Sequence, residues 1–148
     1  MDEKERLLNV LKGDRVDRPP VICPGGMMSA CVTEISDQVE GGHHSDTKAM
    51  VSAARKINEL IGFENYGVPY CLTAEVEALG SSVNLGDNLA EPRVTRYNDE
   101  PLEAIMENYS LVDVTTGRMG IVLEAIRELR NTRVPVIGNV SGHISTAT

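Results

Sequence analysis

The sequence predicts an α/β fold, the amino-terminal part of an eight-stranded parallel (β/α)8 barrel. Three short apolar runs, Val21–Cys23, Gly67–Cys71 and Val134–Val140, are typical of buried strands. A helical pattern follows the first two directly and is expected to follow the third, and strands that alternate with helices form parallel sheets. A complete barrel needs about 200 residues or more, whereas this chain has 148. We therefore expect one domain, residues 1–148, that holds the first strands of such a barrel.

The helices are predicted from apolar residues at helical spacing. The first covers Asp2–Lys12, with Leu7, Leu8 and Leu11 on one side, and precedes the first strand. Further helices are expected over Met27–Val39, from Ser45 or Asp46 to Ile61, over Thr73–Gly80, Pro101–Asn108 and Gly117–Leu129. Between them, Ser81–Tyr97 predicts two short strands around a Gly-Asp-Asn turn, a small β excursion from the main sheet.

Composition excludes several classes of function. The chain carries 14 basic and 22 acidic residues, a formal net charge of -8, so we expect no binding to nucleic acid or to anionic membranes. No apolar run approaches the roughly 20 residues that span a bilayer, and the sequence MDEKER opens no signal peptide. The three cysteines lack CxxC spacing, which argues against a disulfide framework. These features predict a cytoplasmic protein.

Candidate binding residues lie where the predicted strands end. Parallel strands joined by crossovers of one hand place these three junctions at the same edge of the sheet. The turn Pro24-Gly25-Gly26 either admits a substrate close to the backbone or only reverses the chain, and both interpretations stay open. A polar residue in a buried strand, such as Asn139, needs a partner. The predicted substrate-binding residues are Gly25, Gly26, Met27, Tyr70, Cys71, Asn139 and His143.

Two groups of residues are possible metal ligands, and each group also has a purely structural interpretation. Cys23, Cys71 and His143 are a suitable donor set for zinc, but their long spacing matches no known zinc motif, which favours buried cysteines and a loop histidine. His43 and His44 are potential ligands as well, although a polar pair just before a helix is expected to be solvated. We therefore predict no metal ligand in this chain.

The start of the helix after the second strand carries polar residues near the expected site. Thr73 is predicted to cap this helix, and Glu75 and Glu77 fall in its first turn. A role as general base is one interpretation of the two carboxylates. Stabilisation of the helix is favoured, because a helix N-terminus lowers the pKa of a carboxyl group and so opposes proton abstraction at neutral pH.

Four segments of the chain occur in a characteristic order: RLLNVLKGDRVDRPPV, HSDTKAM, VPYCLTAEVEALG and VLEAIRELR with VPVIGNVSG. This order resembles the amino-terminal half of the uroporphyrinogen decarboxylase superfamily, whose fold is a TIM barrel. The resemblance is closer to the methylcobamide:coenzyme M methyltransferase branch. Decarboxylases carry MRQAGRY after the first strand and an aspartate after the second; here CPGGMMS and Cys71 stand at those places. The resemblance therefore disfavours a decarboxylase.

The resemblance implies a cobalamin-dependent methyltransferase of one-carbon metabolism and methanogenesis. Such enzymes move a methyl group from methylcobalamin, carried on a partner corrinoid protein, to a small thiol such as coenzyme M. In the family, zinc bound by a His-x-Cys pair and a later Cys of the carboxyl-terminal half activates the thiol. This sequence contains no His-x-Cys, so its catalytic residues stay unknown and the chain alone is expected to be inactive.

Two alternatives to a methyltransferase fragment stay open. One is a uroporphyrinogen decarboxylase-like function, and the other is a non-catalytic partial barrel that acts as a binding or assembly module. An open sheet edge after Val140 would leave backbone groups unpaired. We therefore expect either self-association or association with a complementary carboxyl-terminal half.

Overall fold

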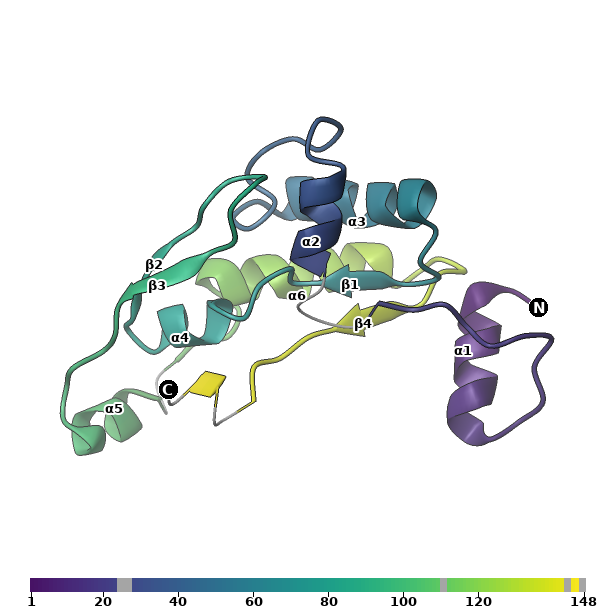
Figure 1. Cartoon of the computed structure of the whole chain (residues 1–148). Helices are drawn as coiled ribbons and strands as arrows, with labels where there is room; N and C mark the ends of the chain where they lie inside the picture. Colours follow the sequence, from purple (N-terminus) through teal and green to yellow (C-terminus); the bar gives the residue numbers. More distant parts are fainter. Residues whose placement is uncertain (24–27, 110–111, 143–144, 147–148) are drawn as a thin grey trace.

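The computed structural model describes residues 1–23, 28–109, 112–142 and 145–146. Two parallel strands, β1 (Tyr66–Val68) and β4 (Val136–Gly138), lie side by side in the middle of the molecule (Figure 1). The helices are α1 (Glu3–Lys12), α2 (Met28–Glu34), α3 (Thr47–Ile61), α4 (Ala74–Ala78), α5 (Leu102–Tyr109) and α6 (Gly117–Leu129). The order of the helices and of the second and third predicted strands agrees with the sequence prediction.

Strands β1 and β4 are direct neighbours although helices α4, α5 and α6 separate them in sequence. Tyr66 is paired with Val136 and Val68 with Gly138. Helices α3 and α6 pack against each other and against β1, and Val68, Met50, Ile57 and Leu129 are almost completely buried between these elements. The predicted parallel arrangement of the second and third strands is confirmed.

The prediction of a first strand at residues 21–23 is wrong for the described structure. The segment has no assigned secondary structure, and the Glu64 amide donates to the Val21 carbonyl over 2.7 Å. The side chain of Asn65, rather than a backbone ladder, then pairs with both the amide and the carbonyl of Cys23, at 2.8 and 3.2 Å. Prolines on both sides of the segment explain this, because Pro20 and Pro24 have no N–H for a ladder.

Several elements are shorter than predicted. Strand β1 ends at Val68 because Pro69 cannot donate to the ladder, and β4 covers only the middle of its predicted run. Helix α2 ends at Glu34 rather than Val39 and continues as turns in which the Ser36 and Gln38 amides bond three residues back. The β excursion is confirmed: β2 (Ser82–Asn84) and β3 (Arg93–Arg96) are antiparallel.

The predicted apolar face of α1 is only partly buried. Leu7 is buried, but Leu8 and Leu11 are 44% and 73% exposed. The helix is instead attached through Arg6, which is 5% exposed. Its guanidinium donates to both oxygens of Asp17, at 2.8 and 2.9 Å, and to Glu64 Oε2 at 2.9 Å. Charge pairing therefore fixes this helix more than its leucines do.

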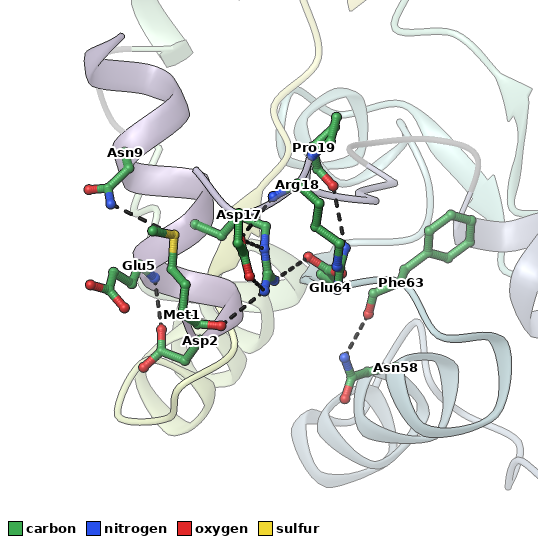
Figure 2. A network of polar contacts seen from close by, with 11 residues as sticks. Met1, Asp2, Glu5, Asn9, Asp17, Arg18, Pro19, Asn58, Phe63 and Glu64 are labelled. Carbon is green, nitrogen blue, oxygen red and sulfur yellow. Dashed lines mark hydrogen bonds and ion pairs between the residues drawn. The ribbon is translucent and has the colours of Figure 1, made fainter. Parts of the chain in front are cut away.

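The contacts of Arg6 join α1 to Asp17 and to Glu64, which lies just before β1; Figure 2 shows Asp17, Arg18 and Glu64 close together. Arg6 also donates to the Met1 carbonyl at 2.9 Å, and Arg18 forms an ion pair with the second oxygen of Glu64. We call Arg6, Asp17, Arg18 and Glu64 the amino-edge cluster. Two guanidinium groups face two carboxylates in it, so its charges balance.

Candidate functional site

The carboxyl edge of the sheet is built around the loop between β1 and α4. Cys71 and Thr73 in this loop are buried. The Thr73 hydroxyl donates to Cys71 Sγ at 3.4 Å, and the α4 N-terminus receives no side-chain hydrogen bond from Thr73. Thr73 therefore stands at the N-cap position of α4, as predicted, but its hydroxyl contacts side chains of the loop and of α6 in place of a capping hydrogen bond.

Arg118, in the first turn of α6, organises this loop. Its guanidinium donates to Thr73 Oγ1 from both terminal nitrogens, at 3.1 and 2.8 Å, and from Nη2 to Cys71 Sγ at 3.1 Å. Arg118 Nε lies 3.2 Å from Glu77 Oε2, an ion-pair distance, but without hydrogen-bond alignment. The Arg118 side chain is 7% exposed and that of Glu77 is 36% exposed. The loop thus holds a buried cation beside a thiol and a hydroxyl.

Arg118 was missed by the sequence interpretation, although one signal was available. A cation in the first turn of a helix opposes the helix dipole, whose N-terminal end is positive. Such a residue needs tertiary partners to compensate, which Thr73, Cys71 and Glu77 provide. A basic residue at an otherwise well-patterned helix start therefore indicates a buried polar contact.

His43 and His44 lie next to this loop and are buried, at 2% and 6% exposure, so the expectation of a solvated pair is wrong. Their ring centroids are 4.2 Å apart, and both rings meet the edge of Tyr70 at 5.7 and 6.1 Å. Burial lowers the pKa of His43. Burial, assisted by the charges of His43 and Arg118, lowers the pKa of His44 to about 3. Both imidazoles are therefore neutral at pH 7.

Tyr70, predicted to line a pocket, is fully buried. Its hydroxyl donates to the Met50 carbonyl of α3 at 2.5 Å, and burial raises the pKa of the phenol. In the described structure Tyr70 therefore fixes α3 to the end of β1 and supports the two histidine rings, while its hydroxyl is already engaged.

A second set of contacts joins the loops that follow β1 and β4. The Asn139 side chain donates to the Pro69 carbonyl at 3.2 Å, which supplies the partner that this polar residue was expected to need. Glu75 accepts from the Ser141 amide at 3.0 Å and from its hydroxyl at 3.2 Å. Glu75 thus holds the loop after β4 in addition to its place at the start of α4.

The remaining predicted residues divide into two groups. Gly25, Gly26, Met27 and His143 lie outside the described residues. Cys23 and Cys71 are buried free thiols, and no three His, Cys, Asp or Glu side chains come together as a metal site within the described ranges. Of the predicted substrate residues that can be placed, Tyr70, Cys71 and Asn139 all lie at the carboxyl edge of β1 and β4, where α/β barrels carry their active sites.

With this geometry in place, the class of the protein can be stated. Residues 2–148 match the protein family described as uroporphyrinogen decarboxylase (URO-D). The match covers almost the whole chain, so the chain belongs to this family, and its α/β fold is the amino-terminal part of the family's TIM barrel.

Within the family, the chain is similar to methylcobamide:CoM methyltransferases. It is 34% identical to MtbA of Methanosarcina mazei over 149 residues, covering 97% of this chain and 43% of the relative. MtaA of Methanosarcina barkeri is 31% identical over 152 residues with the same coverage. A solved methyltransferase from Methanosarcina mazei superimposes with a TM-score of 0.73 at 31% identity, over 99% of this chain and 44% of that one. The chain spans less than half the length of these relatives.

No helix in the described part of the chain is long and apolar enough to cross a bilayer.

Proposed function

We propose that this chain forms the amino-terminal part of a cobalamin-dependent methyltransferase that transfers a methyl group from a methylated corrinoid protein to a thiol such as coenzyme M. The observation that carries the proposal is the similarity over 97% of the chain to proteins named for methylcobamide:CoM methyl transfer. Cys71 supports the choice within the family, because its sulfur faces a guanidinium where a decarboxylase would place a carboxylate.

Within that reaction, this chain supplies part of the substrate wall. The carboxyl edge places Arg118 and Thr73 around the end of β1, while Asn139 and Glu75 keep the loops after β1 and β4 in place. The family's zinc does not fit the described residues, which contain no three-ligand group. In this proposal, thiol activation is a task of the rest of the barrel and not of the described residues.

We also infer that the chain works in association with further barrel strands. In the described residues β4 pairs on one side only, with β1, and Val140 just beyond it is 83% exposed. Leu72, in the loop after β1, is 50% exposed. An unpaired strand edge with apolar neighbours is a surface that another chain or segment covers. A complementary carboxyl-terminal half or a second copy of the chain would cover it.

The proposal is tested by co-expression of the chain with the part of Methanosarcina mazei MtbA that extends beyond the matched region. We expect a complex that demethylates methylcobalamin in the presence of coenzyme M, followed through the change in corrinoid absorbance. Each half alone is the control, and we expect neither to be active. A stable, folded complex without methyl transfer would contradict the proposal and favour a binding or assembly module.

A simpler measurement addresses association alone. Light scattering on the isolated chain is expected to show oligomers, or else fluorescence is expected to show binding of a hydrophobic dye. Val140→Ser is expected to reduce either signal. A monodisperse monomer that binds no dye would contradict the inferred association.

A further inference from the structure

The β2–β3 hairpin is attached to the rest of the molecule mainly at its base and at its tip, residues 86–91. Its strands pair with each other, and within the described residues neither forms an extensive contact with another helix or strand. In Figure 1 the hairpin extends from the end of α4 to the α2–α3 segment, residues 35–46, on the side to which β1 points. A two-stranded hairpin alone is only marginally stable in water. Its position therefore depends on these two attachments.

The tip is a compact turn that holds its own shape. Asp87 Oδ1 accepts from the Leu89 and Ala90 amides at 2.7 and 2.9 Å. The Asp87 amide donates to the Ala90 carbonyl at 3.1 Å. Gly86 closes the turn with a φ of +66°, and a Cβ there would collide with the Ala90 carbonyl oxygen. The tip can therefore move without a change in its own conformation.

Two side chains of the tip attach it to α2 and to the α2–α3 segment. Asn88 Nδ2 donates to the Ser36 and Val39 carbonyls, at 3.1 and 2.9 Å. Glu91 accepts a hydrogen bond from the Ser29 hydroxyl in the first turn of α2. Segments that are held by a few polar contacts open at a lower free energy than the core of a protein. The tip is a segment of this kind.

The attached tip also pays a cost in polar burial. Asn88 Oδ1 is buried and has no hydrogen-bond partner in the described structure, which is unfavourable for an amide. A hollow of about 540 Å³ lies between the tip and the α2–α3 segment, lined by Asp37 and Gly42 on one side and by Gly86 and Leu89 on the other. Leu89 is 71% exposed, so apolar packing adds little. When the tip detaches, water can bind Asn88 Oδ1, and this offsets part of the two lost hydrogen bonds.

The base of the hairpin provides a place at which it can pivot. Asn98 joins the segments that enter and leave the hairpin, because its side chain donates to the Leu79 carbonyl at 2.7 Å and its amide to Ser81 Oγ at 3.3 Å. Gly80, beside Asn98, has a φ of +95°, in the left-handed region that glycine adopts easily. Hinges are short segments of this kind at the end of a rigid element.

We propose that the β2–β3 hairpin is a strap that opens and closes as one unit, by release of its tip from α2 and a pivot at its base. In the closed state the strap connects α4 to α2 on the carboxyl side of β1. Opening frees the α2–α3 segment and widens access to the edge where Cys71 and Asn139 lie. The strap is a property of this chain's fold and does not depend on the proposed methyl transfer.

The distance between two spin labels tests the strap directly. One label is attached at the tip through Leu89→Cys, and the other on α3 through Leu60→Cys, where the native side chain is 47% exposed. The native cysteines are buried, and the chain without added cysteines measures their background labelling. We expect a major, closed distance and a minor, longer one. A single narrow distance that no attachment variant changes would overturn the proposal.

Variants of the attachment are expected to shift these populations. In Asn88→Asp an oxygen replaces the donor nitrogen and faces two carbonyl oxygens, so the ratio of open to closed strap is expected to rise about tenfold or more. Asn84→Asp is the matched control, because Asn84 lies in the same hairpin and its Oδ1 accepts from the Gly86 amide at 3.0 Å, a contact that aspartate keeps. We expect the wild-type ratio for this control. An equal shift in both variants would overturn the proposal.

Hydrogen exchange separates a moving strap from a general loss of structure. In Asn88→Asp we expect faster exchange in the hairpin and in the α2–α3 segment, where the Gln38 amide donates to the Ile35 carbonyl, and unchanged protection of β1 and α3. An equal loss of protection in β1 and α3 would show that the tip is part of the core, and would overturn the proposal. If Asn88→Asp does not fold, Glu91→Ala, which removes only the contact to Ser29, decides by the same two measurements.

Discussion

Two buried arginines, at opposite ends of β1, show how differently this fold uses the same side chain. At the amino edge, the hydrogen bonds that Arg6 donates, chiefly to Asp17 and also to Glu64, raise its pKa against the opposing effect of burial. Arg6 in turn lowers the pKa of Asp17. Burial alone would raise the pKa of Glu64, but Arg18 and Arg6 together lower it. Every charge in this cluster has a partner.

At the carboxyl edge, Arg118 contacts a hydroxyl and a thiol, and its charge contributes to the lowered pKa of His44. Three buried nitrogens, of Arg118, His43 and His44, lack a hydrogen-bond partner in the described structure, whereas no buried side-chain atom of the amino-edge cluster does. In α/β barrels the amino face contributes stability and the carboxyl face carries the active site. The difference in charge pairing between the two ends follows this division.

Glu64→Gln is expected to have the largest effect. The Glu64 side chain is 8% exposed and accepts from Arg6 and Arg18, so its neutralisation leaves the buried guanidinium of Arg6 without full compensation. We expect Tm to fall on the order of 10 °C, measured by circular dichroism. The control is Glu128→Gln, since the Arg55–Glu128 pair is about half exposed on both sides and we expect its Tm to change by about 2 °C or less. Equal effects of the two variants would refute the stabilising role of the amino-edge cluster.

The second expectation concerns pH and separates the two ends. His44 has a pKa of about 3 in the folded chain against an ordinary 6.5, so between these values the unfolded chain binds more protons than the folded one. The free energy of unfolding therefore falls as pH decreases below 6.5, by up to about 1.4 kcal/mol per pH unit for each such histidine. Asp17 and Glu64 have lowered pKa values, so their contribution is lost only at more acidic pH, from about 4 downwards.

Urea denaturation at pH 7, 6 and 5 measures the histidine contribution, and a further measurement at pH 3 gives the loss at acidic pH. The double substitution of His43 and His44 by Gln is expected to flatten the slope between pH 6.5 and 5 and to leave the loss below pH 4 in place. A wild-type slope that the substitution does not change would show that other groups cause the acid sensitivity.

Arg118→Gln is expected to cost less stability than Glu64→Gln. Its contacts to Thr73 and Cys71 are to neutral groups, and the Glu77 carboxylate reaches solvent when Arg118 is removed. We expect a loss of about 1–2 kcal/mol in the free energy of unfolding. Chemical denaturation of both variants side by side provides the measurement. Arg118→Lys keeps the positive charge but not the planar guanidinium, and so separates the effect of charge from that of hydrogen-bond geometry. A loss larger than that of Glu64→Gln would reverse the comparison and make the carboxyl edge the main stabilising end.

The order of the helices and strands can be predicted from the sequence, but the partners of the buried polar groups cannot. Apolar spacing indicates α3 and α6, and the alternation of strands with helices indicates the parallel pairing of β1 with β4. The strand predicted at 21–23 does not form, because a strand needs backbone partners on a neighbouring strand. Here the Asn65 side chain pairs with the backbone amide and carbonyl of Cys23 instead. A local pattern contains no information about such a distant partner.

The candidate site shows the same limit. Tyr70, Cys71 and Asn139 were predicted because each stands at the end of an apolar run, and their common edge follows from strand direction. The sequence places His43 and His44 in solvent, because polar residues are normally exposed. For the same reason it gives no indication that Arg118 is buried. Their burial depends on long-range contacts, such as the rings against Tyr70 and the guanidinium against Thr73.

The smallest expected effects compare the helix caps at the two ends. Asp46 accepts from the Ala49 amide at 2.8 Å and starts α3 directly after the histidine pair, and Asp2 accepts from the Glu5 amide at 2.8 Å and starts α1. Either residue changed to Ala is expected to lose about 1 kcal/mol at most. Because α3 packs on the sheet and α1 is attached mainly through Arg6, Asp46→Ala is expected to reduce global stability more than Asp2→Ala. Hydrogen exchange distinguishes the two cases: fraying confined to α1 is expected for Asp2→Ala, and weaker protection of α3 and β1 together for Asp46→Ala. If Asp2→Ala also weakened protection of β1, α1 and the sheet would unfold as one unit, and the amino-edge cluster would couple them more strongly than its position at the end of the sheet indicates.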